Sequence, residues 1–157
     1  MEMSELLSTQ LIVARLEAES KEDVLRVLFG KLYNAGFVKQ SFLGGVIKRE
    51  DRFPTGLQLN KYGVALPHTD VEHVIRPALA VATLLKPVVF RNMAEPSKEV
   101  RVNVVFMIAL TKSGDQIETL QQLAYLLQND VAVERIVDAK RGDEIIEIVK
   151  STPLISN

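Results

Sequence analysis

Residues 100–110, VRVNVVFMIAL, form an almost uninterrupted apolar run in which β-branched residues are frequent. Residues 78–85, ALAVATLL, form a second run of the same kind. Such runs are typical of strands that are covered on both faces, because a strand with one wet face alternates apolar and polar residues. Residues 10–16 and 64–66 are shorter strand candidates. The sequence therefore predicts a mostly buried sheet.

Amphipathic helices are predicted around these strands. Ser20 and Asp23 precede apolar residues at helical spacing and Gly36 follows them, which predicts a helix over residues 21–35. Ser41 is expected to cap a second helix that ends in the charged residues 48–52.

Three more helices are predicted towards the end of the chain. Asp115 and Glu118 have capping-box spacing at the start of the first, and the others cover residues 130–139 and 143–150. Helices on both sides of apolar strands predict a three-layer α/β/α sandwich. We expect all 157 residues to form one domain.

The composition excludes several classes of function. Lys and Arg number 19 against 20 Asp and Glu, so the net charge of -1 gives no general attraction to nucleic acid or anionic membranes. The absence of Cys excludes disulfides, thiol nucleophiles and Cys-ligated zinc. The chain shows neither a basic-then-apolar leader nor an apolar run long enough for a membrane span, so a cytoplasmic protein is expected.

Residues 63–70, GVALPHTD, carry the most informative motif. A short apolar strand ends at Pro67, which places His68 at the strand end. A neutral imidazole has one unprotonated ring nitrogen, so this histidine is suited to accept a phosphoryl group. The backbone N–H groups of Thr69 and Asp70 are the expected ligands of the phosphoryl oxygens. The simpler interpretation is a surface histidine in a turn.

His73 follows His68 by five residues, with Asp70 between them. Two histidines and a carboxylate are suitable zinc ligands, and a metal-dependent hydrolase is one hypothesis for the set. On a helix, however, positions five apart differ by about 140°, so the two rings would not share a face. The spacing does not favour a metal site, and a solvated polar residue is the simpler interpretation of His73.

Arg49 lies in the charged run and leaves two interpretations open. Charge runs are usually solvated helix ends, whereas a guanidinium in that place also suits bidentate contact with a phosphoryl group. Residues 53–56, FPTG, predict a turn with Phe53 packed in the core. Residues 55–62 lack hydrophobic periodicity and predict a loop.

The residues KRE at 48–50, FPTG at 53–56 and GVALPH at 63–68, taken together, resemble the IIA component of the phosphoenolpyruvate-dependent sugar phosphotransferase system, fructose-mannitol class. The FPTG loop and a second His five residues after the first resemble its galactitol branch. The similarity extends over residues 6–150. The resemblance implies a mixed sheet of about five strands flanked by helices, in agreement with the three-layer prediction.

The resemblance also implies a phosphotransferase activity. His68 would accept a phosphoryl group from the carrier protein HPr and pass it to a cysteine of a cognate IIB component, and Arg49 would help to hold the group. No cofactor, nucleotide or metal is implied. Both partners would bind transiently, and the chain would be peripheral to the membrane only through the IIB and IIC components.

One position departs from the mannitol-type members. These members have a second active-site histidine before the helix that follows residues 100–110, and Gln116 stands about where that histidine would be. A supporting role at the phosphoryl site is therefore open to Gln116, to His73 or to neither. A regulatory protein of the nitrogen-related branch, which controls other proteins instead of a transporter, is the alternative function. The sequence does not reveal which sugar or polyol is served.

Overall fold

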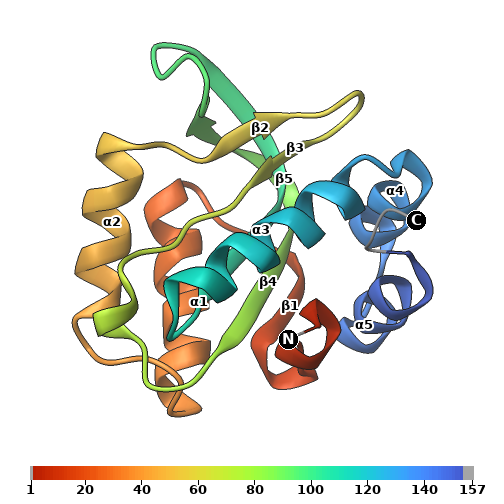
Figure 1. Ribbon diagram of the computed structural model, residues 1–157. Helices are drawn as coiled ribbons and strands as arrows, with labels where there is room; N and C mark the ends of the chain where they lie inside the picture. Colours follow the sequence, from red (N-terminus) through yellow and green to blue (C-terminus); the bar gives the residue numbers. More distant parts are fainter. Residues whose placement is uncertain (1, 154–157) are drawn as a thin grey trace.

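A mixed sheet of five strands forms the middle of the computed structural model, which describes residues 2–153 (Figure 1). The strand order is β1-β4-β5-β3-β2. The two long strands, β4 and β5, pair antiparallel, while β1 runs parallel to β4 and β3 runs parallel to β5. The strands are β1 (Ile12–Leu16), β2 (Gly56–Gln58), β3 (Gly63–Ala65), β4 (Ala78–Arg91) and β5 (Glu99–Ala109).

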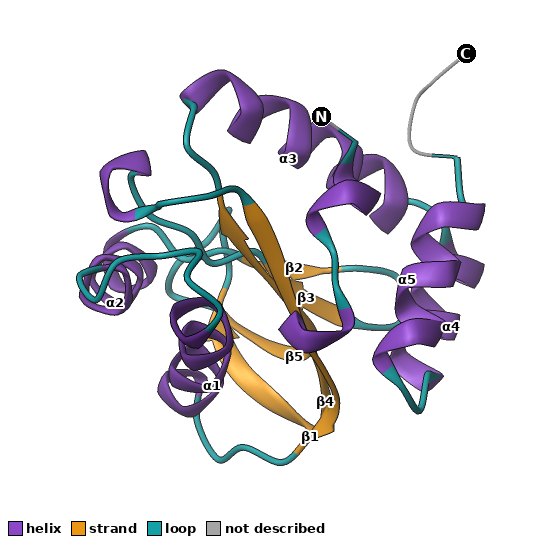
Figure 2. Ribbon diagram, turned by 90° about the horizontal axis from the view of Figure 1, so that it is seen from below, coloured by secondary structure: helices purple, strands orange, loops and turns teal. Residues whose placement is uncertain are grey.

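Helices cover both faces of this sheet, so the predicted three-layer α/β/α sandwich is confirmed. Figure 2 shows α1 and α2 on one side of the strands and α3, α4 and α5 on the other. The α-helices are α1 (Lys21–Asn34), α2 (Phe42–Arg52), α3 (Ser113–Leu127), α4 (Asp130–Asp138) and α5 (Gly142–Ser151). Short 3-10 helices are η1 (Met3–Leu6), η2 (Thr9–Leu11) and η3 (Val71–His73). Within residues 2–153, no helix is long and apolar enough to cross a bilayer.

The alternate side chains of residues 104–109, the second half of β5, explain the uninterrupted apolar sequence of that part of the strand. Phe106 and Ile108 pack on the side of α3 to α5, whereas Val105 and Met107 pack on the side of α1 and α2. All four side chains are buried. Each such side chain contributes about 1.5–3 kcal/mol on burial, so both faces of this strand stabilise the fold.

The predicted ends of α1 are confirmed, but two other caps were wrong. The Ser20 hydroxyl accepts a hydrogen bond from the Asp23 N–H (3.2 Å), and Gly36 has the positive φ of 83° that lets the chain leave the helix. Ser41 makes no capping bond, because its hydroxyl is paired with His73 instead. Asp115 does not start α3, which begins two residues earlier at Ser113.

Residues 55–62 are not the plain loop that the sequence predicted. They contain β2, which pairs antiparallel with β3 in a hairpin that the Leu59 N–H closes onto the Tyr62 carbonyl oxygen (2.9 Å). A strand of three residues is too short to show a period, which is why the sequence did not reveal it. Phe53 was also wrongly assigned to the core, since 60% of its surface is exposed.

Gly63 lies where β3 packs closely against β5. A Cβ atom at this position would overlap the backbone carbonyl group of Arg101. The residue must therefore lack a side chain for β3 to keep its place in the sheet.

We expect Gly63→Ala to lower the free energy of unfolding by about 1–3 kcal/mol, since the added methyl group meets backbone that cannot rotate away. Gly30→Ala is the matched control, because its Cβ atom would meet nothing within 4 Å inside α1. That variant should gain about 0.5–1 kcal/mol through helix propensity. Urea denaturation measures both changes, and a Gly63→Ala variant as stable as Gly30→Ala would contradict the packing described for β3.

Candidate active site

His68 lies three residues beyond β3, next to the strand β5. An isolated parallel bridge pairs it with Ile108, whose N–H donates to the Pro67 carbonyl oxygen (3.0 Å). Pro67 has no N–H of its own and a restricted φ, so the chain leaves β3 in a fixed direction. The sheet therefore holds the backbone on which the His68 ring is mounted.

The ring of His68 is held in one tautomer. Its Nδ1 atom lies 2.8 Å from the carbonyl oxygen of Leu66. A carbonyl oxygen only accepts hydrogen bonds, so Nδ1 carries the hydrogen and the free electron pair of the neutral ring is on Nε2. The nucleophilic atom of this side chain is consequently Nε2.

Partial burial is the main cause of a lowered pKa at His68. The nearby positive charge of Arg49 lowers this pKa further, whereas the hydrogen bond to Leu66 and the negative charge of Asp70 act in the opposite direction. The pKa lies below the ordinary value of 6.5, so the ring is neutral at neutral pH. A neutral ring is the form that attacks a phosphoryl group.

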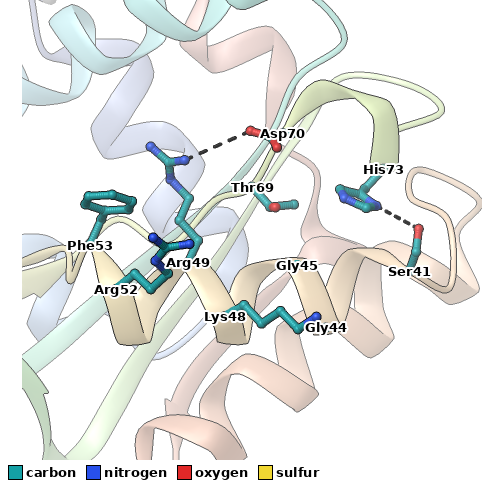
Figure 3. Close-up of a pocket in the computed structure, with 10 residues that line it drawn as sticks. All are labelled: Ser41, Gly44, Gly45, Lys48, Arg49, Arg52, Phe53, Thr69, Asp70 and His73. Carbon is teal, nitrogen blue, oxygen red and sulfur yellow. Dashed lines mark hydrogen bonds and ion pairs between the residues drawn. The ribbon is translucent and has the colours of Figure 1, made fainter.

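Arg49 reaches the same place from α2. Its guanidinium Nη1 lies 4.0 Å from a carboxylate oxygen of Asp70, an ion pair that Figure 3 shows across the groove between α2 and the segment after His68. The guanidinium also lies over the Phe53 ring, 5.6 Å from its centroid. The structure thus brings together Arg49, His68 and Asp70, three of the residues that the sequence selected.

The groove between α2 and residues 69–73 has a volume of about 460 Å³ and a positive character, and His68 itself is not among its lining residues. Three basic side chains line it, against the single carboxylate of Asp70. Thr69, which directly follows His68, contributes to the same wall. The full lining is Ser41, Gly44, Gly45, Lys48, Arg49, Arg52, Phe53, Thr69, Asp70 and His73. Such a groove suits an anionic group or an acidic surface of another protein.

His73 also lines this groove, at the other end from Arg49, where both of its ring nitrogens have partners. Its Nδ1 atom is 2.8 Å from the Ser41 hydroxyl, a contact drawn in Figure 3. Its Nε2 atom is 3.7 Å from the Glu72 carboxylate. In the part of the chain that the structure describes, no three His, Cys, Asp or Glu side chains form a group that could hold a metal ion.

Gln116 lies in the first turns of α3 and contacts the segment after His68. Its side-chain amide donates to the Thr69 carbonyl oxygen (3.3 Å). The sequence made Gln116 a candidate for a supporting role at the phosphoryl site. The structure places its side chain against the backbone of Thr69, and Gln116 does not line the groove.

Glu50 and Thr55 also contribute to this candidate site, although the sequence predicted no role for either residue. The Glu50 carboxylate accepts hydrogen bonds from the N–H of Thr55 (2.7 Å) and from its hydroxyl (2.8 Å). Burial raises the pKa of Glu50, and the two bonds from Thr55 oppose this rise. A signal was present, since Phe42, Val46 and Glu50 are spaced by four residues and share the buried face of α2.

Comparison with known families identifies the class of protein. Residues 5–152 match the family described as phosphoenolpyruvate-dependent sugar phosphotransferase system, EIIA 2. The chain therefore belongs to this family.

Several relatives are similar over most of the chain. The fructose-specific EIIABC component of the phosphotransferase system of Bacillus subtilis is 29% identical over 95% of this chain and 23% of its own length. The transcriptional regulator ManR of the same organism is 28% identical over 80% of this chain and 18% of its own length. The chain thus spans about a fifth of these two relatives. The galactitol-specific EIIA component of Escherichia coli (strain K12) is 26% identical, over 74% of this chain and 77% of that protein.

The fold is shared with a solved complex of mannitol enzyme IIA and phosphorylated mannitol enzyme IIB from Escherichia coli. The match has a TM-score of 0.75 at 23% identity, and it covers 93% of this chain and 98% of that chain. The mixed sheet with helices on both faces is therefore the fold of this family.

We expect an NMR titration of His68 to give a midpoint below 6.5. Arg49→Gln should raise that midpoint, because it removes a nearby positive charge, and Asp70→Asn should lower it, because it removes a negative one. The His73→Gln variant assigns the His68 resonances, since only two histidines are present. Shifts of the opposite sign in the two charge variants would contradict the arrangement described.

Proposed function

We propose that this chain is a phosphocarrier of a sugar phosphotransferase system, with His68 as the phosphoryl acceptor. The observation that carries the proposal is the hydrogen bond from Nδ1 to Leu66, which leaves the electron pair of a neutral ring on Nε2. Family membership supports the class of reaction. We further propose residues 1–157 as one IIA-type domain.

In the first step, Nε2 of His68 bonds to phosphorus while the bond between phosphorus and the histidine of phospho-HPr breaks. The ring then carries a positive charge, which its Nδ1–H shares with the Leu66 carbonyl oxygen. In the second step, a cysteine thiolate of a IIB component bonds to the same phosphorus and the Nε2–P bond breaks. His68 returns to its neutral form, so the cycle needs neither a nucleotide nor a metal.

Catalysis in this scheme comes from positioning and charge. Arg49 stabilises the negative charge on the phosphoryl oxygens during transfer, and the backbone N–H groups of Thr69 and Asp70 are further proposed ligands. Gln116 supports the segment through the Thr69 carbonyl oxygen. Because His73 is paired with Ser41, we propose that it shapes the groove and takes no direct part in the transfer.

The partners follow from the same scheme. The positive groove suits the negatively charged phosphoryl group that HPr would bring and a IIB component would remove. We propose that both contacts are transient, that the chain acts in the cytoplasm, and that IIB and IIC provide its link to the membrane. Galactitol is one hypothesis for the sugar, supported by a relative at 26% identity. The fructose-specific relative supports a different sugar, so the sugar class is tested through the IIB component.

A regulatory role is the second candidate, and the similarity to the regulator ManR favours it. A regulatory protein would carry the same phosphohistidine and would not pass it to a transporter. Transfer from the phosphorylated chain to the cysteine of a galactitol-type or fructose-type IIB component distinguishes the two roles. Phosphorylation without transfer to either IIB component would favour regulation.

Incubation with phosphoenolpyruvate, enzyme I and HPr should place one acid-labile, base-stable phosphate on the chain. His68→Ala should abolish the label, while His73→Gln should retain it. Arg49→Gln should slow labelling by about 10²–10³-fold, the usual effect of removing one group that stabilises transferring charge. Label that persists in His68→Ala, or wild-type protein that takes no label, would refute the proposed function.

A further inference from the structure

Three hydrogen bonds connect the buried face of α2 to the His68 ring. Glu50 and Thr55 are both buried, with exposed fractions of 2% and 3%. The Thr55 hydroxyl donates to the Glu50 carboxylate (2.8 Å) and accepts from the Leu66 N–H (3.0 Å). The Leu66 carbonyl oxygen accepts in turn from Nδ1 of His68 (2.8 Å).

The direction of each bond in this series is fixed. The Thr55 hydroxyl has a single hydrogen, which it donates in the hydrogen bond to Glu50. The Leu66 N–H therefore donates to a free electron pair on the hydroxyl oxygen. Leu66 is thereby held at its N–H by Thr55, while the next residue is held at its carbonyl oxygen by the N–H of Ile108. The carbonyl group between these two anchors is the one that faces Nδ1 of His68.

The carboxylate of Glu50 has a further bond that holds Thr55 from a second direction. The Thr55 N–H donates to the other carboxylate oxygen at 2.7 Å. Two bonds between the same two residues restrict both the backbone and the side chain of Thr55, and so fix where its hydroxyl oxygen lies. A carboxylate is costly to bury, and these bonds give it partners on both oxygens.

We propose that Glu50 and Thr55 are positioning residues for His68, which hold Leu66 so that its carbonyl oxygen keeps the ring hydrogen on Nδ1 and leaves Nε2 free to accept a phosphoryl group. This inference rests on the proposed function of His68 for its consequence in transfer. Its structural part, the choice of tautomer, stands without that function.

The test compares Thr55→Val with Thr55→Ser. Valine has nearly the same shape as threonine and lacks the hydroxyl, so the Leu66 N–H loses its acceptor, whereas serine restores the hydroxyl. Nitrogen-15 NMR of the neutral ring should show His68 with hydrogen on Nδ1 in the wild type and in Thr55→Ser. Thr55→Val should populate the second tautomer and slow phosphorylation by HPr about tenfold, while Thr55→Ser should stay within about threefold of the wild type.

Thr83→Val is the matched control. Thr83 is also a buried threonine whose hydroxyl accepts from a backbone N–H, that of Arg15 (2.8 Å), but it lies on β4 beside β1. This variant should lose stability and keep the wild-type tautomer and rate. A Thr83→Val effect on His68 equal to that of Thr55→Val would show a general loss of packing and overturn the proposal.

Glu50→Gln provides a second route if Thr55→Val does not fold. An amide has one acceptor oxygen where the carboxylate has two, so one of the bonds with Thr55 is lost. The same change of tautomer is expected. An unchanged tautomer and rate in folded Thr55→Val, or in folded Glu50→Gln, would refute the positioning role while leaving phosphorylation of His68 intact. Absence of phosphorylation in the wild type would instead refute the proposed function, with the tautomer comparison still decisive for the positioning role.

Discussion

The carbonyl oxygen of Leu66 accepts a hydrogen bond from the His68 ring at 2.8 Å, and the chemistry of the site depends on this contact. Both groups lie in the segment just beyond the end of β3, which lies between β2 and β5 in the sheet. Gly63 allows β3 its close approach to β5, and the pairing of His68 with Ile108 continues that contact beyond the strand. The sheet register thus determines which ring nitrogen is free.

Two faces of helix α2 contribute side chains to the site. Arg49 and Glu50 are adjacent in the chain, and a step of about 100° around the helix sends their side chains in different directions. Arg49 faces the groove and the Asp70 carboxylate, whereas Glu50 faces inward to Thr55. Gly45 lets the same helix pack against Thr69, because a Cβ atom there would stand only 2.6 Å from the Thr69 hydroxyl oxygen. One helix therefore supplies both the charge at the site and the anchor behind it.

The parts of the molecule that the sequence predicted are those that local pattern determines. Residues 78–84 of β4 and 104–109 of β5 are buried on both faces, so their burial is visible in composition, and Ser20 and Gly36 mark the ends of α1 through a local hydrogen bond and a local backbone angle. Tertiary contacts determine what the sequence did not reveal. The prediction that Ser41 caps α2 was wrong because its hydroxyl is paired with His73. That partner lies 32 residues away, so the local sequence does not reveal it. Thr55 had no predicted role, because its contact with Leu66 exists only once β2 and β3 have paired.

The identity of the phosphorylated ring nitrogen tests the central claim most directly. The phosphorylated chain, labelled with nitrogen-15, gives a one-bond coupling between phosphorus and the nitrogen that carries it. The hydrogen bond to Leu66 predicts that this nitrogen is Nε2 of His68 and that Nδ1 keeps its hydrogen. Phosphorus on Nδ1 of His68, or on His73, would contradict the account.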